Sequence, residues 1–180
     1  MDPIRIRRGN PADAPALAAF AARSFRETFA ADNRPEDMAA HLASSFGVAQ
    51  QTRELADPAV ATLLALRGEA LVAFAQVRRR TPPACVTQSR PIELQRFYVD
   101  RPVHGTGVAQ ALMAAARQAA REFGGEHLWL GVWERNPRAI AFYAKTGFRD
   151  VGSTVFHVGP DPQTDRVLVS PLTAEGRDAA

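Results

Sequence analysis

Two glycines lie where a strand is expected to give way to a helix. The apolar pattern of residues 92–99 predicts the strand, and Gly105 and Gly107 precede an alanine-rich helix over about 106–123. The first N–H groups of a helix have no partner within it, and glycine lets an anion approach the backbone closely. The segment therefore predicts a pyrophosphate-binding turn. The alternative is a plain strand-to-helix connection in which the glycines serve only the turn.

Two nucleotide-binding motifs fail at this turn. A dinucleotide fingerprint requires a third glycine or alanine where Gln110 stands, and an acidic residue on a strand about 20 residues further on, which is absent. A nucleotidase phosphate loop requires Gly-Lys-Ser/Thr, and the sole lysine is Lys145, far downstream. NAD binding and ATP hydrolysis are both disfavoured.

Two motifs resemble those of the GNAT superfamily of acyl-CoA N-acyltransferases. The first, Arg/Gln-x-x-Gly-x-Gly/Ala after a strand, is similar to residues 104–109, with His104 in place of arginine or glutamine. The second, Asn-x-x-Ala-x-x-Phe-Tyr followed by Gly-Phe, is similar to residues 136–143 and 147–148. Three further segments, 25–38, 129–136 and 156–165, resemble the PaiA-type spermidine/spermine acetyltransferases.

The resemblance implies one fold and one reaction. The fold is a mixed α/β (α+β) GNAT fold with helices on both faces of a mostly antiparallel sheet, which splays at the junction of strands 91–99 and 127–133. The reaction is direct transfer of acetyl from acetyl-CoA to a primary amine, a polyamine such as spermidine or spermine being expected. A protein or peptide amine, an amino acid or an aminoglycoside is the alternative acceptor. A non-catalytic CoA-binding or DNA-binding regulator is the alternative of another class.

A base is required because an alkyl amine with a pKa of roughly 10.4 is neutral only about once in a few thousand molecules at pH 7. Glu93, on the strand before the glycine turn, is the candidate base, or else an outward-facing strand carboxylate. Glu134 is the reserve base. Glu93, Glu134 and Asp32 are the expected amine-binding residues, although an acid near a helix start, such as Asp32, is also favoured by the helix dipole alone.

The resemblance makes Tyr143 the general acid for the departing thiolate, with a core tyrosine as the alternative. It assigns Asn136, which also suits the cap of its own helix, to the pantetheine arm or nearby backbone. The expected cofactor-binding set, with backbone contacts for the first three, is Phe97, Tyr98, Val99, His104, Gly105, Thr106, Gly107, Val108, Ala109, Asn136, Ala139 and Tyr143.

Hydrophobic periodicity and turn residues predict the elements that position these groups. The expected strands are 4–8, 59–66, 70–77, 92–99, 128–133, 148–158 and 166–169, and the expected helices are a first one ending near 30, then 35–46, 50–56, 106–123 and 136–145. The proline-rich segment 81–91, which contains Cys85, is expected to be an exposed loop. One domain is expected over 1–180, with the acetyl-CoA-binding core at about 91–158.

The composition argues against disordered, collagen-like and coiled-coil proteins. Hydrophobic residues make up 46% and charged residues 23% of the 180 residues, which is typical of globular proteins. The formal charge of +3 does not demand a nucleic-acid partner. No stretch predicts a membrane span or signal peptide, so a cytoplasmic location is expected. One cysteine and four scattered histidines predict no metal site. Homodimers are common in the superfamily, but no interface is evident here.

Overall fold

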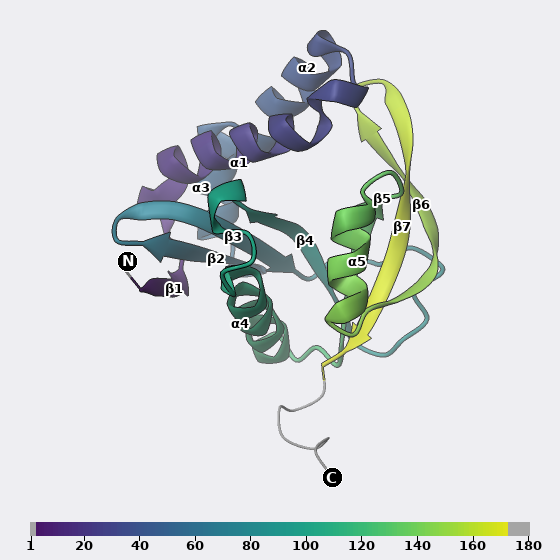
Figure 1. The fold of residues 1–180 in the computed structure, drawn as a ribbon. Helices are drawn as coiled ribbons and strands as arrows, with labels where there is room; N and C mark the ends of the chain where they lie inside the picture. Colours follow the sequence, from purple (N-terminus) through teal and green to yellow (C-terminus); the bar gives the residue numbers. More distant parts are fainter. Residues whose placement is uncertain (1–2, 173–180) are drawn as a thin grey trace.

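A seven-stranded sheet in the order β1-β2-β3-β4-β5-β7-β6 forms the centre of the computed structural model, which describes residues 3–172. Neighbouring strands are antiparallel except for β4 and β5, which are parallel. The strands are β1 (Ile4–Arg8), β2 (Val60–Arg67), β3 (Ala70–Arg78), β4 (Pro91–Val99), β5 (His127–Trp133), β6 (Arg149–Val158) and β7 (Asp161–Pro171). This sheet confirms the expected mixed α/β fold (Figure 1).

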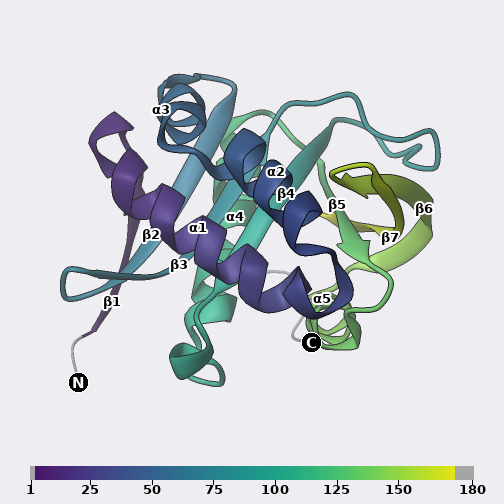
Figure 2. The same cartoon turned by 90° about the horizontal axis from the view of Figure 1, so that it is seen from above.

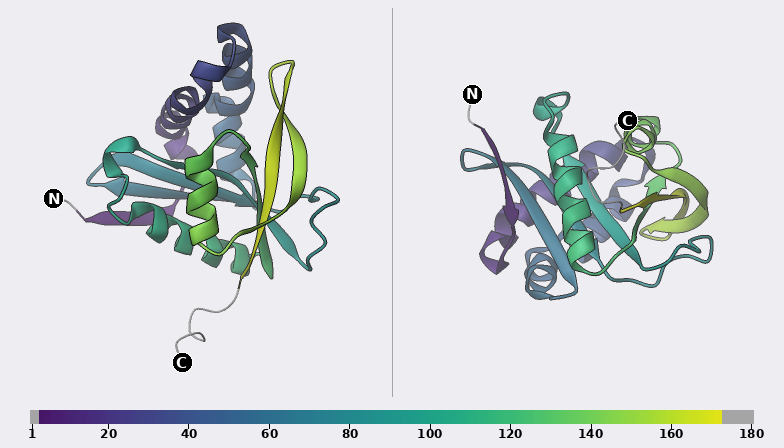
Figure 3. Two further views of the ribbon diagram at one scale, coloured as in Figure 1. Left: turned by 45° about the vertical axis from the view of Figure 1, so that its right-hand side comes forward. Right: turned by 90° about the horizontal axis from the view of Figure 1, so that it is seen from below.

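Helices cover both faces of the sheet, as expected. α1 (Ala14–Phe29), α2 (Pro35–Phe46) and α3 (Val48–Ala56) lie on one face (Figure 2). α4 (Val108–Glu122) and α5 (Pro137–Lys145) lie on the other (Figure 3). α4 begins about two residues later than predicted, because Gly107 has a φ of +86°, which a regular helix does not permit.

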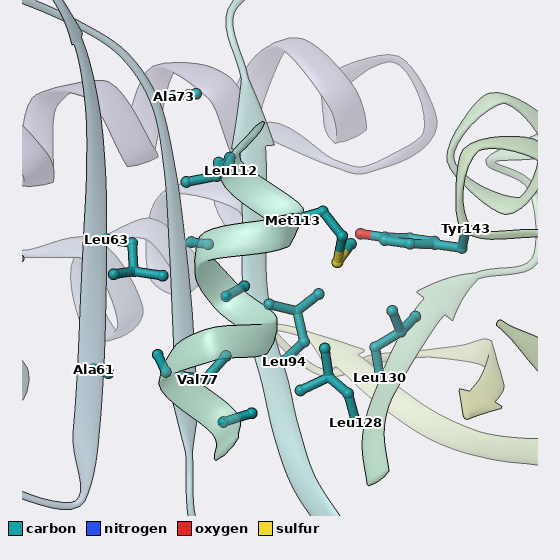
Figure 4. Packing of buried hydrophobic residues seen from close by; sticks show 14 of the residues in the cluster. Ala61, Leu63, Ala73, Val77, Leu94, Leu112, Met113, Leu128, Leu130 and Tyr143 are labelled. Atoms are coloured by element: carbon teal, nitrogen blue, oxygen red, sulfur yellow. The ribbon is translucent and has the colours of Figure 1, made fainter. Parts of the chain in front are cut away.

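A hydrophobic core lies on each face. On the α4 face, Leu112 and Leu128 are fully buried, and Figure 4 shows Met113 of α4 near Leu94 and Leu130 of the sheet. A second core on the α1 face is built from apolar residues of α1, α2, β2 and β3, with Phe25 at its centre. The two cores hold the sheet rigid between its helices, so the strand ends can position side chains.

Two segments differ from the sequence prediction. The loop 79–90 is not simply exposed: Val86 is buried beside Trp129, and Cys85 is half-buried against Gly152. β7 begins at Asp161 and not at 166, because its first residues pair with β6 in a long hairpin. This extension places Asp165 inside a strand.

Within residues 3–172, no helix has the length and apolar character needed to cross a membrane. In the same described part of the chain, no three His, Cys, Asp or Glu side chains are grouped so that they could hold a metal ion.

Candidate active site

A cleft of about 1070 Å³ opens where β4 and β5 separate. These strands pair only from Pro91 to Glu93 and from His127 to Trp129. Gln95 makes a bulge in β4, because on β3 the residues opposite Leu94 and Arg96 are adjacent. The cleft is lined by residues of α1, α2, the start of α4, α5 and β4 to β7, together with the loops that follow β3 and β4. The predicted splay at the junction of 91–99 and 127–133 is therefore present.

The free edge of β4 lines this cleft. Phe97, Tyr98 and Val99 pair with β3 on one side and, within residues 3–172, with no strand on the other. On that side the Val99 carbonyl accepts from the His104 ring, and the remaining backbone N–H and C=O groups can pair with an extended ligand that carries amides, because such groups require hydrogen-bond partners. The ring of Phe97 stacks on that of Phe142 of α5, with ring centres 5.6 Å apart.

The turn from His104 to Ala109 lies at the mouth of the cleft. Gly105 and Gly107 have positive φ angles of +77° and +86°, and a Cβ on either would meet no atom within 4 Å. The open space in front of these glycines and the free N–H groups of the first turn of α4 fit a diphosphate. Val108 is instead buried in the core, and the Thr106 hydroxyl donates to the Val103 carbonyl at 2.7 Å. Gly105 and Ala109 line the cleft, while Thr106, Gly107 and Val108 do not.

His104 contacts Arg138, a residue that the motif analysis did not single out. Its Nε2 lies 2.8 Å from the Val99 carbonyl oxygen, and its Nδ1 lies 2.6 Å from a terminal nitrogen of Arg138. Since a carbonyl only accepts, Nε2 carries the proton and Nδ1 accepts from the guanidinium. Both ring nitrogens are thus occupied, and the cationic group beside the glycine turn is Arg138 on α5.

Tyr143 is buried in the last turn of α5. Burial raises the pKa of its hydroxyl well above the usual value, and nearby Tyr98 raises it further. Burial likewise raises the pKa of Tyr98 to about 12. The Tyr143 hydroxyl points toward Met113 (Figure 4). Tyr143 therefore stays protonated at neutral pH and is a hydrogen-bond donor at the cleft.

Asn136 begins α5 as predicted, because its side-chain oxygen accepts a hydrogen bond from the Ala139 N–H at 3.2 Å. Both residues also line the cleft. The cap fixes the start of α5 and so sets the position of Tyr143, two turns further along the helix.

The three predicted carboxylates lie in different surroundings. Glu93 is buried, and its two oxygens accept from Arg78 at 2.5 Å and from Arg80 at 3.3 Å. Asp32 lines the cleft near the end of α1, with no ion-pair partner in the described part of the chain. Glu134 follows β5 and does not line the cleft.

Asp165 and His41 line the cleft but were missed by sequence reasoning. Burial and the neighbouring Glu134 raise the pKa of Asp165 to about 6. Burial and Arg96 lower the pKa of His41, whose ring stacks on Phe25. The alternation of Asp165, Val167 and Val169 on one strand face was the available signal for Asp165.

Known proteins resemble this chain in sequence and structure. The profile of the acetyltransferase (GNAT) family matches residues 20–148. An uncharacterised N-acetyltransferase of Mycobacterium tuberculosis is 36% identical over 89% of this chain and 98% of its own length. One encoded in the pepI 3′ region of Lactobacillus delbrueckii subsp. lactis is 30% identical over 96% and 99%.

A solved structure shares the whole fold. PaiA N-acetyltransferase from Thermoplasma acidophilum, crystallised with coenzyme A, is 18% identical and has a TM-score of 0.76, covering 94% of this chain and 99% of that one. The splayed β4–β5 junction, the glycine turn and the family match agree with one another. The chain belongs to the GNAT family of acetyltransferases and is an acetyl-CoA-dependent N-acetyltransferase.

Proposed function

We propose that this protein acetylates a small primary amine, and that spermidine or spermine is the acceptor to test first. The observation that carries the proposal is that one cleft brings together the free edge of β4, the glycine turn, Tyr143 and carboxylates that form no ion pair in the described part of the chain. The first two fit a CoA thioester, and the carboxylates fit the cationic amine that receives the acetyl group.

Coenzyme A is expected along β4 and the glycine turn. Backbone groups of Phe97, Tyr98 and Val99 would bind the pantetheine amides, as strand pairing does. The N–H groups of the turn from His104 to Ala109 would bind the diphosphate, with Arg138 adding a positive charge. Acetyl-CoA supplies the activated acyl group, and Tyr143 donates a hydrogen bond or its proton to the departing sulfur.

The acceptor amine is expected on the face covered by α1 and α2. Three carboxylates of the cleft, those of Glu27, Asp32 and Asp165, form no ion pair within residues 3–172. They supply the local negative charge that a protein of net charge +3 needs for a cationic substrate. Glu93 already forms ion pairs with Arg78 and Arg80, which favours another carboxylate as base.

The test is a thiol-release assay with acetyl-CoA and a panel of spermidine, spermine, n-butylamine, a lysine-bearing peptide and an aminoglycoside. Rapid turnover of a polyamine supports the full proposal. Preference for the peptide or the aminoglycoside would overturn the polyamine assignment. Binding of acetyl-CoA without turnover of any amine would overturn the proposed reaction.

Tyr143→Phe tests the donor role in the same assay. Removal of one donor aimed at developing charge costs about 10²–10³ in kcat. We expect a loss of at least about tenfold in kcat with acetyl-CoA affinity unchanged, because the ring still packs against Phe97 and Phe148. An unchanged kcat would assign Tyr143 to the core alone.

A further inference from the structure

Asp165 has a carboxylate oxygen without a partner. Its Oδ1 is buried and forms no hydrogen bond within residues 3–172, and Asp165 lines the cleft. A buried polar atom without a partner is costly, and a catalytic role is one of the reasons for which native proteins retain one. Because the residue also lines the cleft, a cationic donor that binds there would interact with this carboxylate.

The neighbouring strand leaves room for this carboxylate. Gly131 of β5 lies beside Asp165, and a Cβ on Gly131 would come within 2.9 Å of Oδ2. Trp133 lies directly opposite Asp165 in the β5–β7 ladder, and its ring meets that of Phe29 of α1 at 5.3 Å. All four residues line the cleft. An acid is therefore held beside an aromatic wall, which is favourable for an alkylammonium group.

We propose that Asp165 binds the ammonium group of the acceptor and takes its proton as the general base of acetyl transfer. This inference rests on the proposed function and adds the residue that activates the amine. Glu93 is less suited to the role, because both its oxygens are occupied by arginines.

The titratable groups around Asp165 come from several elements. Glu134 after β5 and Tyr98 of β4 interact with it electrostatically, and His41 of α2 and Arg96 of β4 lie along the same cleft. Burial and Glu134 raise the pKa of Asp165 to about 6, so the carboxylate is mostly ionised at pH 7 and is a stronger base than an exposed aspartate.

The proposed step conserves protons and electron pairs. Asp165 takes one proton from the ammonium, and the freed nitrogen lone pair forms a C–N bond with the thioester carbonyl carbon. The C–S bond breaks, its electron pair leaves on sulfur, and the nitrogen loses its second proton. Tyr143 protonates the sulfur and recovers that second proton through solvent. The products are the amide and the thiol, and the proton held by Asp165 returns to water.

Initial rates of the wild type, Asp165→Asn and Gly131→Ala test the proposal from pH 5.5 to 9, with saturating acetyl-CoA and either spermidine or n-butylamine. We expect kcat/KM of the wild type to rise through an inflection near pH 6. Asp165→Asn should lose about 10²-fold or more at pH 7 and lack that inflection. Its rate should increase about tenfold per pH unit toward the amine pKa, because only free neutral amine reacts.

Two variants distinguish the effect of the position of the Asp165 carboxylate from the effect of a negative charge on β7. Gly131→Ala keeps the carboxylate but displaces it, so a partial loss of kcat/KM is expected with an unchanged KM for acetyl-CoA. Asp161→Asn on the same strand removes an equal but exposed charge and should leave the rates unchanged. Retention of the wild-type rate and inflection by Asp165→Asn would overturn the proposal and leave His41 as the group that titrates.

Two further measurements distinguish a failure of the Asp165 proposal from a structural effect of the substitution and from a failure of the proposed function. Above pH 6, Asp165→Asn should unfold at a temperature no lower than the wild type, because it removes a half-buried charge that forms no ion pair within residues 3–172. A lower temperature would show a structural role and overturn the proposal. If the wild type acetylates no amine, the proposed function fails. In that case, calorimetry with n-butylammonium in the presence of CoA tests whether Asp165 binds the ammonium group. Binding that Asp165→Asn abolishes supports this site. Binding that is absent, or that Asp165→Asn leaves unaffected, overturns it.

Discussion

Arg138 illustrates how one side chain changes the interpretation of a motif. His104 stands where the family signature has arginine or glutamine, yet its ring is held between the Val99 carbonyl and the Arg138 guanidinium. The positive charge beside the glycine turn thus comes from a different element. Arginine recognises phosphate oxygens through several N–H groups at once, which a neutral imidazole cannot do.

Arg138→Ala should therefore raise the KM for acetyl-CoA by about tenfold, the effect of losing roughly 1.4 kcal/mol of a charge-assisted contact. The kcat should change little, because Arg138 does not contact the reacting atoms in the proposed mechanism. Initial-rate kinetics at varied acetyl-CoA would measure this effect, with exposed Arg149→Ala as the matched control. Equal KM values for the two variants would refute a phosphate role for Arg138.

The start of α5 could be predicted from the sequence because its signals, Asn136 and the proline that follows it, are local, and the motif resemblance placed Tyr143 on this helix. Sequence reasoning could not find the arginines that hold Glu93. Arg78 reaches Glu93 through the β3–β4 register, and Arg80 reaches it from the loop that follows β3. Such partners depend on pairing between distant segments, which periodicity within one segment does not reveal.

At the level of elements, a buried polar network supports the bulge in β4. Arg96 contacts Glu54 of α3, donates to Gln76 of β3 at 2.6 Å, and lies over the ring of Phe46. These contacts join β3, β4, α2 and α3 next to Gln95. They position the strand edge that lines the cleft.

Glu54→Gln should lower the free energy of unfolding by about 3–5 kcal/mol, because it leaves the buried Arg96 guanidinium without its counter-charge. Urea titration followed by circular dichroism would measure the change. Glu69→Gln in the exposed β2–β3 turn is the matched control, expected within about 0.5 kcal/mol of the wild type. A Glu54→Gln variant as stable as this control would show that the network contributes little.

Element prediction succeeded where local signals were strong and failed where a distant contact decides. The proline and N-cap signals gave the helices within a few residues, and the Arg67–Glu69 turn gave the β2–β3 hairpin. The loop 79–90 was expected to be exposed, but Val86 packs against Trp129 of β5. The start of β7 was missed because Asp161–Asp165 is polar, and only its pairing with β6 makes it a strand.

At the scale of the molecule, the sheet consists of two groups of strands joined by three residue pairs. One group is β1 to β4 and the other is β5 to β7, and within the sheet β4 and β5 pair over Pro91–Glu93 and His127–Trp129. A ligand that spans the cleft would contact both groups and bind the folded state alone. Its binding free energy therefore adds to the stability of the protein.

Acetyl-CoA at about 100 times its dissociation constant should raise the free energy of unfolding by about 2.7 kcal/mol, which for a chain of this size corresponds to a shift in Tm of roughly 5–10 °C. Thermal unfolding with and without acetyl-CoA would measure it, and acetate at the same concentration is the control. A Tm that does not move while calorimetry detects binding would mean that the ligand also binds unfolded chains.

The free edge of β4 has a consequence for solubility. The backbone groups proposed to bind the pantetheine arm are of the kind through which exposed strands of different molecules join into aggregates. α1, α2 and the loop 79–90 surround this edge, and the Gln95 bulge interrupts its regular spacing. A bound CoA would occupy the edge in place of another strand. Bound co-substrate on the free edge of β4 is therefore expected to reduce self-association of the protein.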